Sequence, residues 1–226
     1  MSEPATSMDL APFIEHTILR PDASREEIKR LCSEALENRF VAVCVNGSRV
    51  IEACALLEGS GVNVAAVAGF PLGAMDPDVK RYETEVAVDN GASEIDVVLN
   101  IGRLKDGDRS FILRELRDVV EAADERPVKV IIETCLLTRD EMSVASNLVV
   151  ESGARYVKTS TGFGPSNGTI EDVRFLRKTV GEEFGLKAAG GIRNYETAVA
   201  MIEAGANRLG TSSGVALLRS PDERNL

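Results

Sequence analysis

The stretch Ala154–Pro165, which reads ARYVKTSTGFGP, guides the interpretation of the whole 226-residue chain. Its segment Arg155–Val157 is typical of a β-strand, and it delivers Lys158 to a turn rich in hydroxyl groups and glycine. A lysine beside an apolar strand is costly unless it is paired or used. Side-chain oxygens and free backbone N–H groups in such a turn can bind an anion. The stretch therefore predicts a nucleophilic amine next to an anion site.

Short apolar runs of strand length alternate with amphipathic segments along the chain. The expected strands are Phe13–Thr17, Phe40–Val45, Val62–Ala68, Glu94–Leu99, Val128–Glu133, Arg155–Val157, Leu186–Ala189 and Asn207–Gly210. Apolar strands separated by helices indicate a parallel α/β sheet that is buried on both faces. Eight such units in this length favour one (β/α)8 TIM-barrel domain over residues 1–226, with a short N-terminal extension. An open doubly wound sheet is the alternative, but no G-x-G-x-x-G follows the first strand.

Capping residues mark where helices begin. Ser24 with Glu27, and Thr138 with Glu141, match the pattern of a capping box, and Pro77 suits a first helical turn. The expected helices start at Ser24 and at Thr138, the latter ending at Gly153, and cover Arg49–Glu58, Pro77–Asp89, Ser110–Asp124, Ile170–Val180 and Asn194–Glu203.

The composition is that of an ordinary globular protein, with 44% hydrophobic and 27% charged residues. A net charge of −10 disfavours nucleic acid and anionic membrane surfaces as partners. The N-terminus has no signal-peptide pattern, and no apolar run is long enough to span a membrane, so we expect a cytoplasmic protein. We also expect a homo-oligomer, of a size that the sequence does not fix. One histidine and four cysteines without a C-x-x-C pattern give no metal-ligand cluster.

At the end of the strands where a barrel forms its active site, three charged residues interrupt the apolar runs: Asp96 in EIDVVL, Lys158 in YVKTS and Lys187 in LKAAGG. Any one of them alone would be interpreted as an ion-paired or snorkelling side chain. In a barrel, however, alternate side chains point inward and the active site forms at the carboxyl ends of the strands. A partly desolvated lysine beside a second ammonium has a lowered pKa, about 7–8 in enzymes that use one, and can attack a carbonyl group. The three residues together predict Schiff-base chemistry.

Two glycine-rich loops supply the rest of the expected site. Gly190–Arg193 follows the seventh strand and Gly210–Gly214 follows the eighth, which is where barrels of this kind bind phosphate. The hydroxyl of Thr159 is a further candidate anion ligand, and the expected substrate is a small phosphorylated carbonyl compound. We expect Thr17, Cys44 and Phe70 to line the pocket. Cys44 has no evident histidine partner, so a wall is favoured over a nucleophile.

With these residues identified, the chain resembles the deoxyribose-phosphate aldolase family of class I aldolases. The matching segments are 69–74 (GFPLGA), 94–102 (EIDVVLNIG), 129–138 (KVIIETCLLT), 156–162 (YVKTSTG) and 187–193 (KAAGGIR). The resemblance implies reversible cleavage of 2-deoxy-D-ribose 5-phosphate to acetaldehyde and D-glyceraldehyde 3-phosphate, without a metal or organic cofactor. It places the Schiff-base lysine at Lys158, the second lysine at Lys187 and the catalytic aspartate at Asp96. It places phosphate contacts at Gly162, Gly190, Gly191, Arg193, Gly210, Ser212 and Ser213.

The chain departs from the family pattern at three places. Glu15 stands where the family has aspartate, Gly47 stands where many members have proline, and the C-terminal stretch Ser220–Leu226 lacks the tyrosine that assists proton transfer in some members. Two other functions compete: another phosphate-binding barrel, an isomerase or a synthase, and a catalytically inactive barrel that senses sugar phosphates. The first would ordinarily use carboxylate or histidine bases, and the intact lysines and aspartate disfavour the second.

Overall fold

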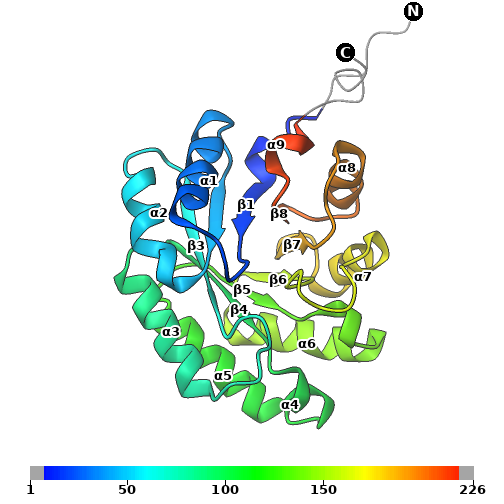
Figure 1. Cartoon of the computed structure of the whole chain (residues 1–226). Coiled ribbons are helices and arrows are strands. Elements are labelled where there is room, and N and C mark those ends of the chain that lie inside the picture. The colour runs from blue at the N-terminus through cyan, green and yellow to red at the C-terminus, as the bar shows by residue number, and fades with distance from the viewer. Residues whose placement is uncertain (1–7, 219–226) are drawn as a thin grey trace, which may run out of the picture.

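Runs of small and β-branched residues form eight strands, which a computed structural model closes into a parallel barrel (Figure 1). The structure describes residues 8–218. The strands are β1 (Ile14–Ile18), β2 (Ala42–Val45), β3 (Asn63–Ala68), β4 (Glu94–Val98), β5 (Val128–Ile131), β6 (Tyr156–Lys158), β7 (Gly185–Ala189) and β8 (Arg208–Thr211). Each strand pairs with the next, and β1 closes the ring by pairing with β8. The predicted (β/α)8 barrel is confirmed, and the open doubly wound alternative is wrong.

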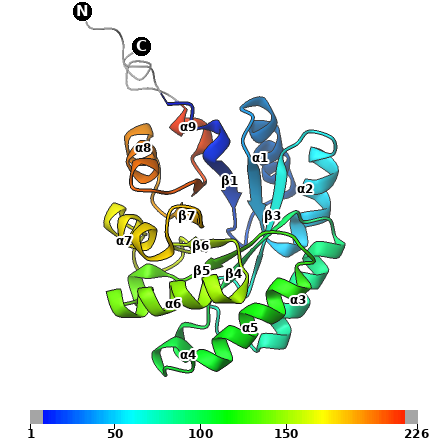
Figure 2. The same ribbon diagram turned by 180° about the vertical axis from the view of Figure 1, so that it is seen from behind.

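Helices follow the strands and wrap the outside of the barrel (Figures 1 and 2). They are α1 (Arg25–Glu37), α2 (Val50–Leu57), α3 (Pro77–Asp89), α4 (Ile101–Lys105), α5 (Arg109–Ala122), α6 (Arg139–Ser152), α7 (Ile170–Val180), α8 (Tyr195–Glu203) and α9 (Gly214–Leu217). Short 3-10 turns occur at η1 (Ala11–Phe13), η2 (Gly47–Arg49) and η3 (Thr134–Leu136). The bounds predicted for α3 and α7 are confirmed.

The predicted capping boxes are present at both helices. At α1 the backbone N–H of Ser24 donates to Glu27 Oε2 at 2.9 Å, and the N–H of Glu27 donates back to Ser24 Oγ. Thr138 and Glu141 exchange the same two bonds at the start of α6, which ends at Gly153 in the left-handed conformation. Local chemistry therefore determines where these helices begin and end.

Some boundaries differ from the sequence expectation because backbone bonds compete there. Strand β2 begins at Ala42 because the N–H of Phe40 closes the end of α1 by donating to Ala35 O. Strand β5 ends at Ile131 because Glu133 adopts a left-handed conformation, with φ 51°. Helix α4 was not expected, and it begins where the Asn100 side chain accepts from the N–H of Arg103.

The buried side chains form two separate apolar regions. A large core lies between the outer face of the barrel and the helices, and it includes Ile95, Leu116 and Leu186. A small cluster of four residues lies elsewhere: Leu19, Cys44, Ala65 and Val67. Leu19 directly follows β1, and the other three belong to β2 and β3, so small apolar side chains fill one side of the interior. Charged side chains of the other strands occupy the rest, and they form the candidate site.

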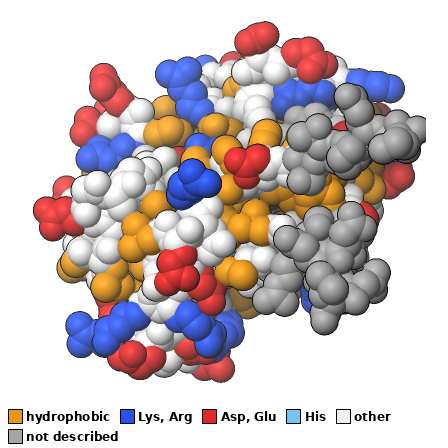
Figure 3. Space-filling view, turned by 90° about the horizontal axis from the view of Figure 1, so that it is seen from above, with side chains coloured by type: hydrophobic (Ala, Val, Ile, Leu, Met, Phe, Trp, Pro, Cys, Tyr) orange, Lys and Arg blue, Asp and Glu red, His pale blue; other side chains and the backbone are white. Residues whose placement is uncertain are grey.

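The surface carries charges of both signs. On the face shown in Figure 3, basic and acidic side chains are interspersed, with hydrophobic side chains between them. Within residues 8–218 there is no helix with both the length and the apolar character needed to cross a bilayer.

Candidate active site

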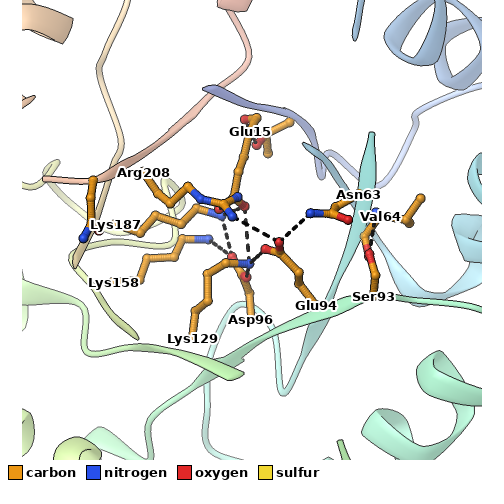
Figure 4. Close-up of polar contacts among 12 residues, drawn as sticks. Glu15, Asn63, Val64, Ser93, Glu94, Asp96, Lys129, Lys158, Lys187 and Arg208 are labelled. Carbon is orange, nitrogen blue, oxygen red and sulfur yellow. Dashed lines mark hydrogen bonds and ion pairs between the residues drawn. The ribbon is translucent and has the colours of Figure 1, made fainter. Parts of the chain in front are cut away.

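Strand register brings the charged side chains of the barrel interior together. Asp96 of β4 pairs with Lys129 of β5, and Lys158 of β6 pairs with Lys187 of β7. Paired residues of neighbouring parallel strands point to the same side of the sheet, so all four enter the barrel. Figure 4 shows their side chains converging from different strands, together with Glu15, Glu94 and Arg208.

Asp96 lies at the centre of this cluster and is fully buried. Its Oδ2 accepts from Lys158 Nζ and from Lys187 Nζ, each at 2.7 Å, and its Oδ1 accepts from Lys129 Nζ at 2.8 Å. Burial acts to raise the pKa of Asp96, but the three ammonium charges together outweigh it and hold that pKa well below its usual range. Asp96 is therefore an anion that three lysines share.

Lys187 and Lys129 are each held by more than one carboxylate. Lys187 donates to Asp96 and to Glu15, and Lys129 lies 2.5 Å from Glu94 Oε2 and 3.5 Å from Glu15 Oε2. Burial acts to lower the pKa of both lysines, yet the carboxylates outweigh it and raise both values above the ordinary lysine pKa. Both side chains therefore remain ammonium groups across the physiological pH range.

The cluster contains one more cation than carboxylates. Its cations are Lys129, Lys158, Lys187 and Arg208, and its carboxylates are Glu15, Glu94 and Asp96. Lys158 is the lysine that contacts a single carboxylate, and it is also the one that reaches a cavity. Within this cluster, Lys158 is therefore the amine that a molecule in the cavity can reach.

A cavity of about 440 Å³ opens above Lys158. Eight predicted site residues line it: Thr17, Lys158, Gly162, Gly190, Gly191, Arg193, Gly210 and Ser212. Asp96 and Lys187 do not line the cavity. Asp96 contacts Lys158 from inside the barrel, and Lys187 contacts Asp96. The structure therefore brings the predicted lysines and the predicted phosphate loops to one place.

Besides Asp96 and Lys187, four further predicted residues lie outside the cavity lining. Thr159 is fully buried, and its Oγ1 bonds with the backbone of Ala189 on the next strand. Ser213 uses its N–H to bond Thr211 Oγ1. Cys44 lies in the small inner cluster, and Phe70 packs on that cluster. The expectation that Cys44 and Phe70 line the cavity is corrected accordingly: apolar neighbours of β1 and β3 cover Cys44, and Phe70 only reaches Phe163, which does line it.

The glycines of the loops differ in why a larger residue would not fit or in which hydrogen bond their backbone makes. Gly190 and Gly191 have φ of 89° and 73°, and a Cβ at either would lie 2.7–2.8 Å from the side chain of Asn167. A Cβ at Gly210 would make tight contacts, 3.0 Å to Lys187 Cε and 3.2 Å to Ala189 Cβ. The N–H of Gly162 donates to Ser160 Oγ at 3.0 Å. In the described part of the chain, the N–H groups of Gly190 and Gly191 have no acceptor within the protein.

With this geometry established, comparisons identify the family. The model of the DeoC/LacD family aldolases matches residues 10–220. This chain belongs to that family. The deoxyribose-phosphate aldolase of Exiguobacterium sibiricum is 53% identical over 212 residues, which are 93% of this chain and 96% of that relative. The deoxyribose-phosphate aldolase of Thermococcus gammatolerans is 54% identical over 215 residues, with the same coverage of both chains.

Solved aldolase structures share the fold. The aldolase QR15 superposes with a TM-score of 0.89 at 38% identity, covering 93% of this chain and 94% of its own. The structure described as a unique tetrameric deoxyribose phosphate aldolase from Aeropyrum pernix has a TM-score of 0.86 at 33% identity, and it covers 92% and 89% of the two chains.

The departures of this DeoC/LacD aldolase from the family pattern have local consequences. The carboxylate of Glu15 reaches Lys187 and Lys129, and although burial acts to raise its pKa, those two charges lower it. Gly47 begins the short η2 turn, where a side chain would meet no neighbour. The C-terminal stretch without tyrosine, Ser220–Leu226, lies outside the described residues.

Sequence reasoning missed several residues of this aldolase site. Lys129 lies in the strand sequence VKVIIE, which carries the same signal as Lys158, a lysine within a short apolar strand. Glu94 and Arg208 lie at the starts of their strands, where charge is common, so their burial had no sequence signal. Asn167 lines the cavity from the β6–α7 loop, and only the fold brings it to Gly190.

Cys44 and His16 are the remaining side chains that could carry chemistry near the site. Burial raises the pKa of the Cys44 thiol to about 11, so it remains protonated at neutral pH. His16 Nε2 lies 2.6 Å from Glu34 Oε2, and the ring packs against Phe40. This is the contact of a structural hydrogen-bonder. Among residues 8–218 no group of three or more His, Cys, Asp and Glu side chains is arranged to hold a metal ion.

Proposed function

We propose that this chain is a class I aldolase that reversibly cleaves 2-deoxy-D-ribose 5-phosphate to acetaldehyde and D-glyceraldehyde 3-phosphate, with Lys158 as the imine-forming residue. One observation carries the proposal: of the three lysines around Asp96, Lys158 is the one that lines the cavity and contacts a single carboxylate. The names of the relatives support the substrate, since deoxyribose-phosphate aldolases match this chain over nearly its whole length.

In the first step, neutral Lys158 Nζ attacks the aldehyde carbon of the open-chain sugar and forms a carbinolamine. Loss of the carbinolamine hydroxyl as water then gives a protonated imine. Lys187 stays an ammonium and is not the nucleophile, because the carboxylates of Asp96 and Glu15 outweigh the effect of burial and raise its pKa. Lys158 is one of the three cations that lower the pKa of Asp96. When Lys158 is neutral, Asp96 therefore binds a proton more readily than when all three lysines are charged.

In the second step, a base takes the proton of the hydroxyl at C3, and the bond between C2 and C3 breaks. The electron pair of that bond moves into the protonated imine to give an enamine, and C3 becomes the aldehyde carbon of glyceraldehyde 3-phosphate. Protonation of the enamine at C2 and hydrolysis of the resulting imine release acetaldehyde. The proposal assigns these proton transfers to Asp96, acting through a water molecule, because its Oδ2 bridges Lys158 and Lys187.

The phosphate end of the substrate is assigned to the other wall of the cavity. The unpaired N–H groups of Gly190 and Gly191, with Arg193 and Ser212 in the same wall, form a suitable anion site. Phosphate bound there contributes binding energy that positions the aldehyde carbon near Lys158.

Three further properties of the enzyme can be tested: its oligomeric state, its need for a cofactor and its location in the cell. We expect a homo-oligomer, as the Aeropyrum pernix relative is described as a tetramer, and light scattering on the purified protein measures its size. We expect activity without a metal or organic cofactor, so treatment with EDTA should leave turnover intact. A cytoplasmic location is the accompanying expectation, and cell fractionation tests it.

Borohydride trapping tests the central assignment. Reduction of the imine formed with acetaldehyde should add one ethyl group to the peptide that contains Lys158. Labelling of Lys187 with Lys158 unmodified would reverse the assignment. Absence of any adduct in a protein that cleaves the sugar phosphate would exclude an imine mechanism.

A further inference from the structure

Glu133 is a buried carboxylate that the imine chemistry leaves without a role. It follows β5 directly, is 4% exposed, and forms no ion pair with any lysine, arginine or histidine of residues 8–218. A buried carboxylate without a cation is costly unless hydrogen bonds satisfy it. Its backbone is also unusual, since φ of 51° is a left-handed conformation that glutamate rarely adopts. Two costly features at one residue beside an active site indicate a specific task.

The carboxylate of Glu133 holds the loop between β6 and α7. Its oxygens accept from the N–H of Thr161 at 3.3 Å and from Thr161 Oγ1, and Cys135 Sγ lies 3.8 Å from Oε1. Gly164 of the same loop leaves space for it, because a Cβ there would lie 3.1 Å from Glu133 Cδ. The loop is therefore fastened to this carboxylate at Thr161 and fits around it at Gly164.

The left-handed turn also changes the pairing between β5 and β6. The N–H of Ile132 donates to Lys158 O at 3.0 Å, and the N–H of Thr134 donates to Thr159 O at 2.9 Å. Between these two hydrogen bonds the donor moves by two residues after β5, whereas the acceptor moves by only one residue after β6. This is the pattern of a β-bulge, with Glu133 as the extra residue. A bulge redirects a side chain, and here it turns the carboxylate toward the loop that follows Lys158.

We propose that Glu133 is a positioning residue that fixes Thr161, Gly162 and Phe163 as the wall of the substrate cavity. These three loop residues line the cavity together with Lys158. The inference rests on the proposed function, which it deepens: Glu133 touches no reacting atom, and it acts through the loop on how the sugar phosphate is held.

Glu133→Gln tests this role, because an amide keeps one acceptor but turns an NH2 group toward a donor of Thr161. We expect KM for 2-deoxyribose 5-phosphate to rise about tenfold, the effect of losing a hydrogen bond to a charged group, with kcat changed less than about threefold. Borohydride trapping of acetaldehyde on Lys158 should stay near the wild-type level, since that substrate is too small to need the loop. Glu115→Gln is the matched control, because it changes an equally buried carboxylate in the helical shell.

Thr161→Val carries the same test if Glu133→Gln does not fold. It removes the Oγ1 donor and should raise KM in the same direction, and the double variant should be no worse than Glu133→Gln alone. An unchanged KM in either folded variant, an equal rise in Glu115→Gln, or fully additive effects would overturn the inference. Failure of the wild-type protein to cleave the sugar phosphate or to trap acetaldehyde would instead refute the proposed function.

Discussion

Lys80 and Lys158 are both buried lysines in contact with a carboxylate, yet they lie in different parts of the molecule. Lys80 of α3 is fully buried in the helical shell, where its Nζ donates to Glu115 Oε1 at 2.8 Å and to Val98 O at 2.9 Å. Lys158 is 2% exposed and donates to Asp96 at 2.7 Å, but it lines the 440 Å³ cavity. Burial and pairing are common to both, so neither property alone marks a catalytic lysine.

The pKa directions separate the two regions. In the helical shell, burial lowers the pKa of Lys80 and raises that of Glu115, and the nearby opposite charges, Glu115 and Glu83 for Lys80 and Lys80 for Glu115, do not compensate. In the barrel interior, burial acts in the same senses, but several opposite charges outweigh it, so the pKa of Lys187 is raised and that of Asp96 is lowered. Several opposite charges therefore keep Lys187 and Asp96 ionised, whereas burial favours the neutral forms of Lys80 and Glu115.

The largest expected effect comes from removing the side-chain amine of Lys158, with the same change at Lys80 for comparison. Lys158→Met should lower turnover by about 10⁴-fold or more, because the nucleophile is lost, as for other covalent catalysts. Lys80→Met should leave kcat per folded molecule near the wild-type value, since no reacting group is touched. Steady-state kinetics corrected for the folded fraction compares the two. Equal loss in both variants would remove the distinction drawn between the two regions.

The second effect concerns the shared anion. Asp96→Asn keeps the shape of the side chain but cannot carry protons, so turnover should fall by about 10²-fold or more. Some borohydride trapping at Lys158 should remain, because the nucleophile is still present. Rapid-quench turnover and mass analysis of the trapped peptide measure the two separately. Near-normal turnover in this variant would exclude Asp96 as the acid–base group.

The third effect is a shift in pH dependence. Because its pKa is raised, Lys187 is an ammonium at every pH where the enzyme is expected to work. Lys187→Leu removes a positive charge that lies on the same Asp96 oxygen as Lys158 Nζ, and loss of a neighbouring positive charge favours the protonated form of an amine. The acid limb of the kcat profile should therefore move upward in pH, in addition to a lower rate. A profile that keeps its position would contradict the electrostatic role of Lys187.

The smallest effect is expected from an apolar replacement of the shell pair. Lys80→Met alone should destabilise the fold by about 3–5 kcal/mol because Glu115 is left unpaired, whereas Lys80→Met with Glu115→Leu should be neutral or stabilising. Urea unfolding of wild type, single and double variants measures this difference. A double variant as unstable as the single one would show that the pair contributes net stability.

The same shell pair has a defined pH signature. The raised pKa of Glu115 means that its contribution to stability is complete below its unfolded value of 4.5 and is lost as pH rises through the folded pKa. The lowered pKa of Lys80 means that its contribution to the free energy of unfolding is complete only above its unfolded value of 10.5, and it is lost as pH falls through the folded pKa. The advantage of the double variant over wild type should therefore be greatest near neutral pH and smaller at both extremes.

The sequence by itself determined the eight strands, their order and most of the helices between them, although not α4. Capping pairs such as Ser24 with Glu27 specify helix starts through bonds between near neighbours, and apolar runs of strand length specify a parallel sheet buried on both faces. The sequence also determined which charges stand out, because Asp96, Lys158 and Lys187 interrupt apolar strands. These signals are local, since a cap or an alternation acts within a few residues.

Tertiary structure alone decided which of these charges meet and which side chains reach the cavity. Lys129 has the same sequence signal as Lys158, but the register of β5 and β6 pairs it with Tyr156, two residues before Lys158, so it contacts Asp96 without lining the cavity. Cys44 reads as a pocket residue, yet side chains of neighbouring strands cover it. The left-handed turn of Glu133 arises only where β5 leaves β6. The physical reason is that burial, pKa and contact depend on charges and surfaces that are distant in the chain and meet only when the barrel closes.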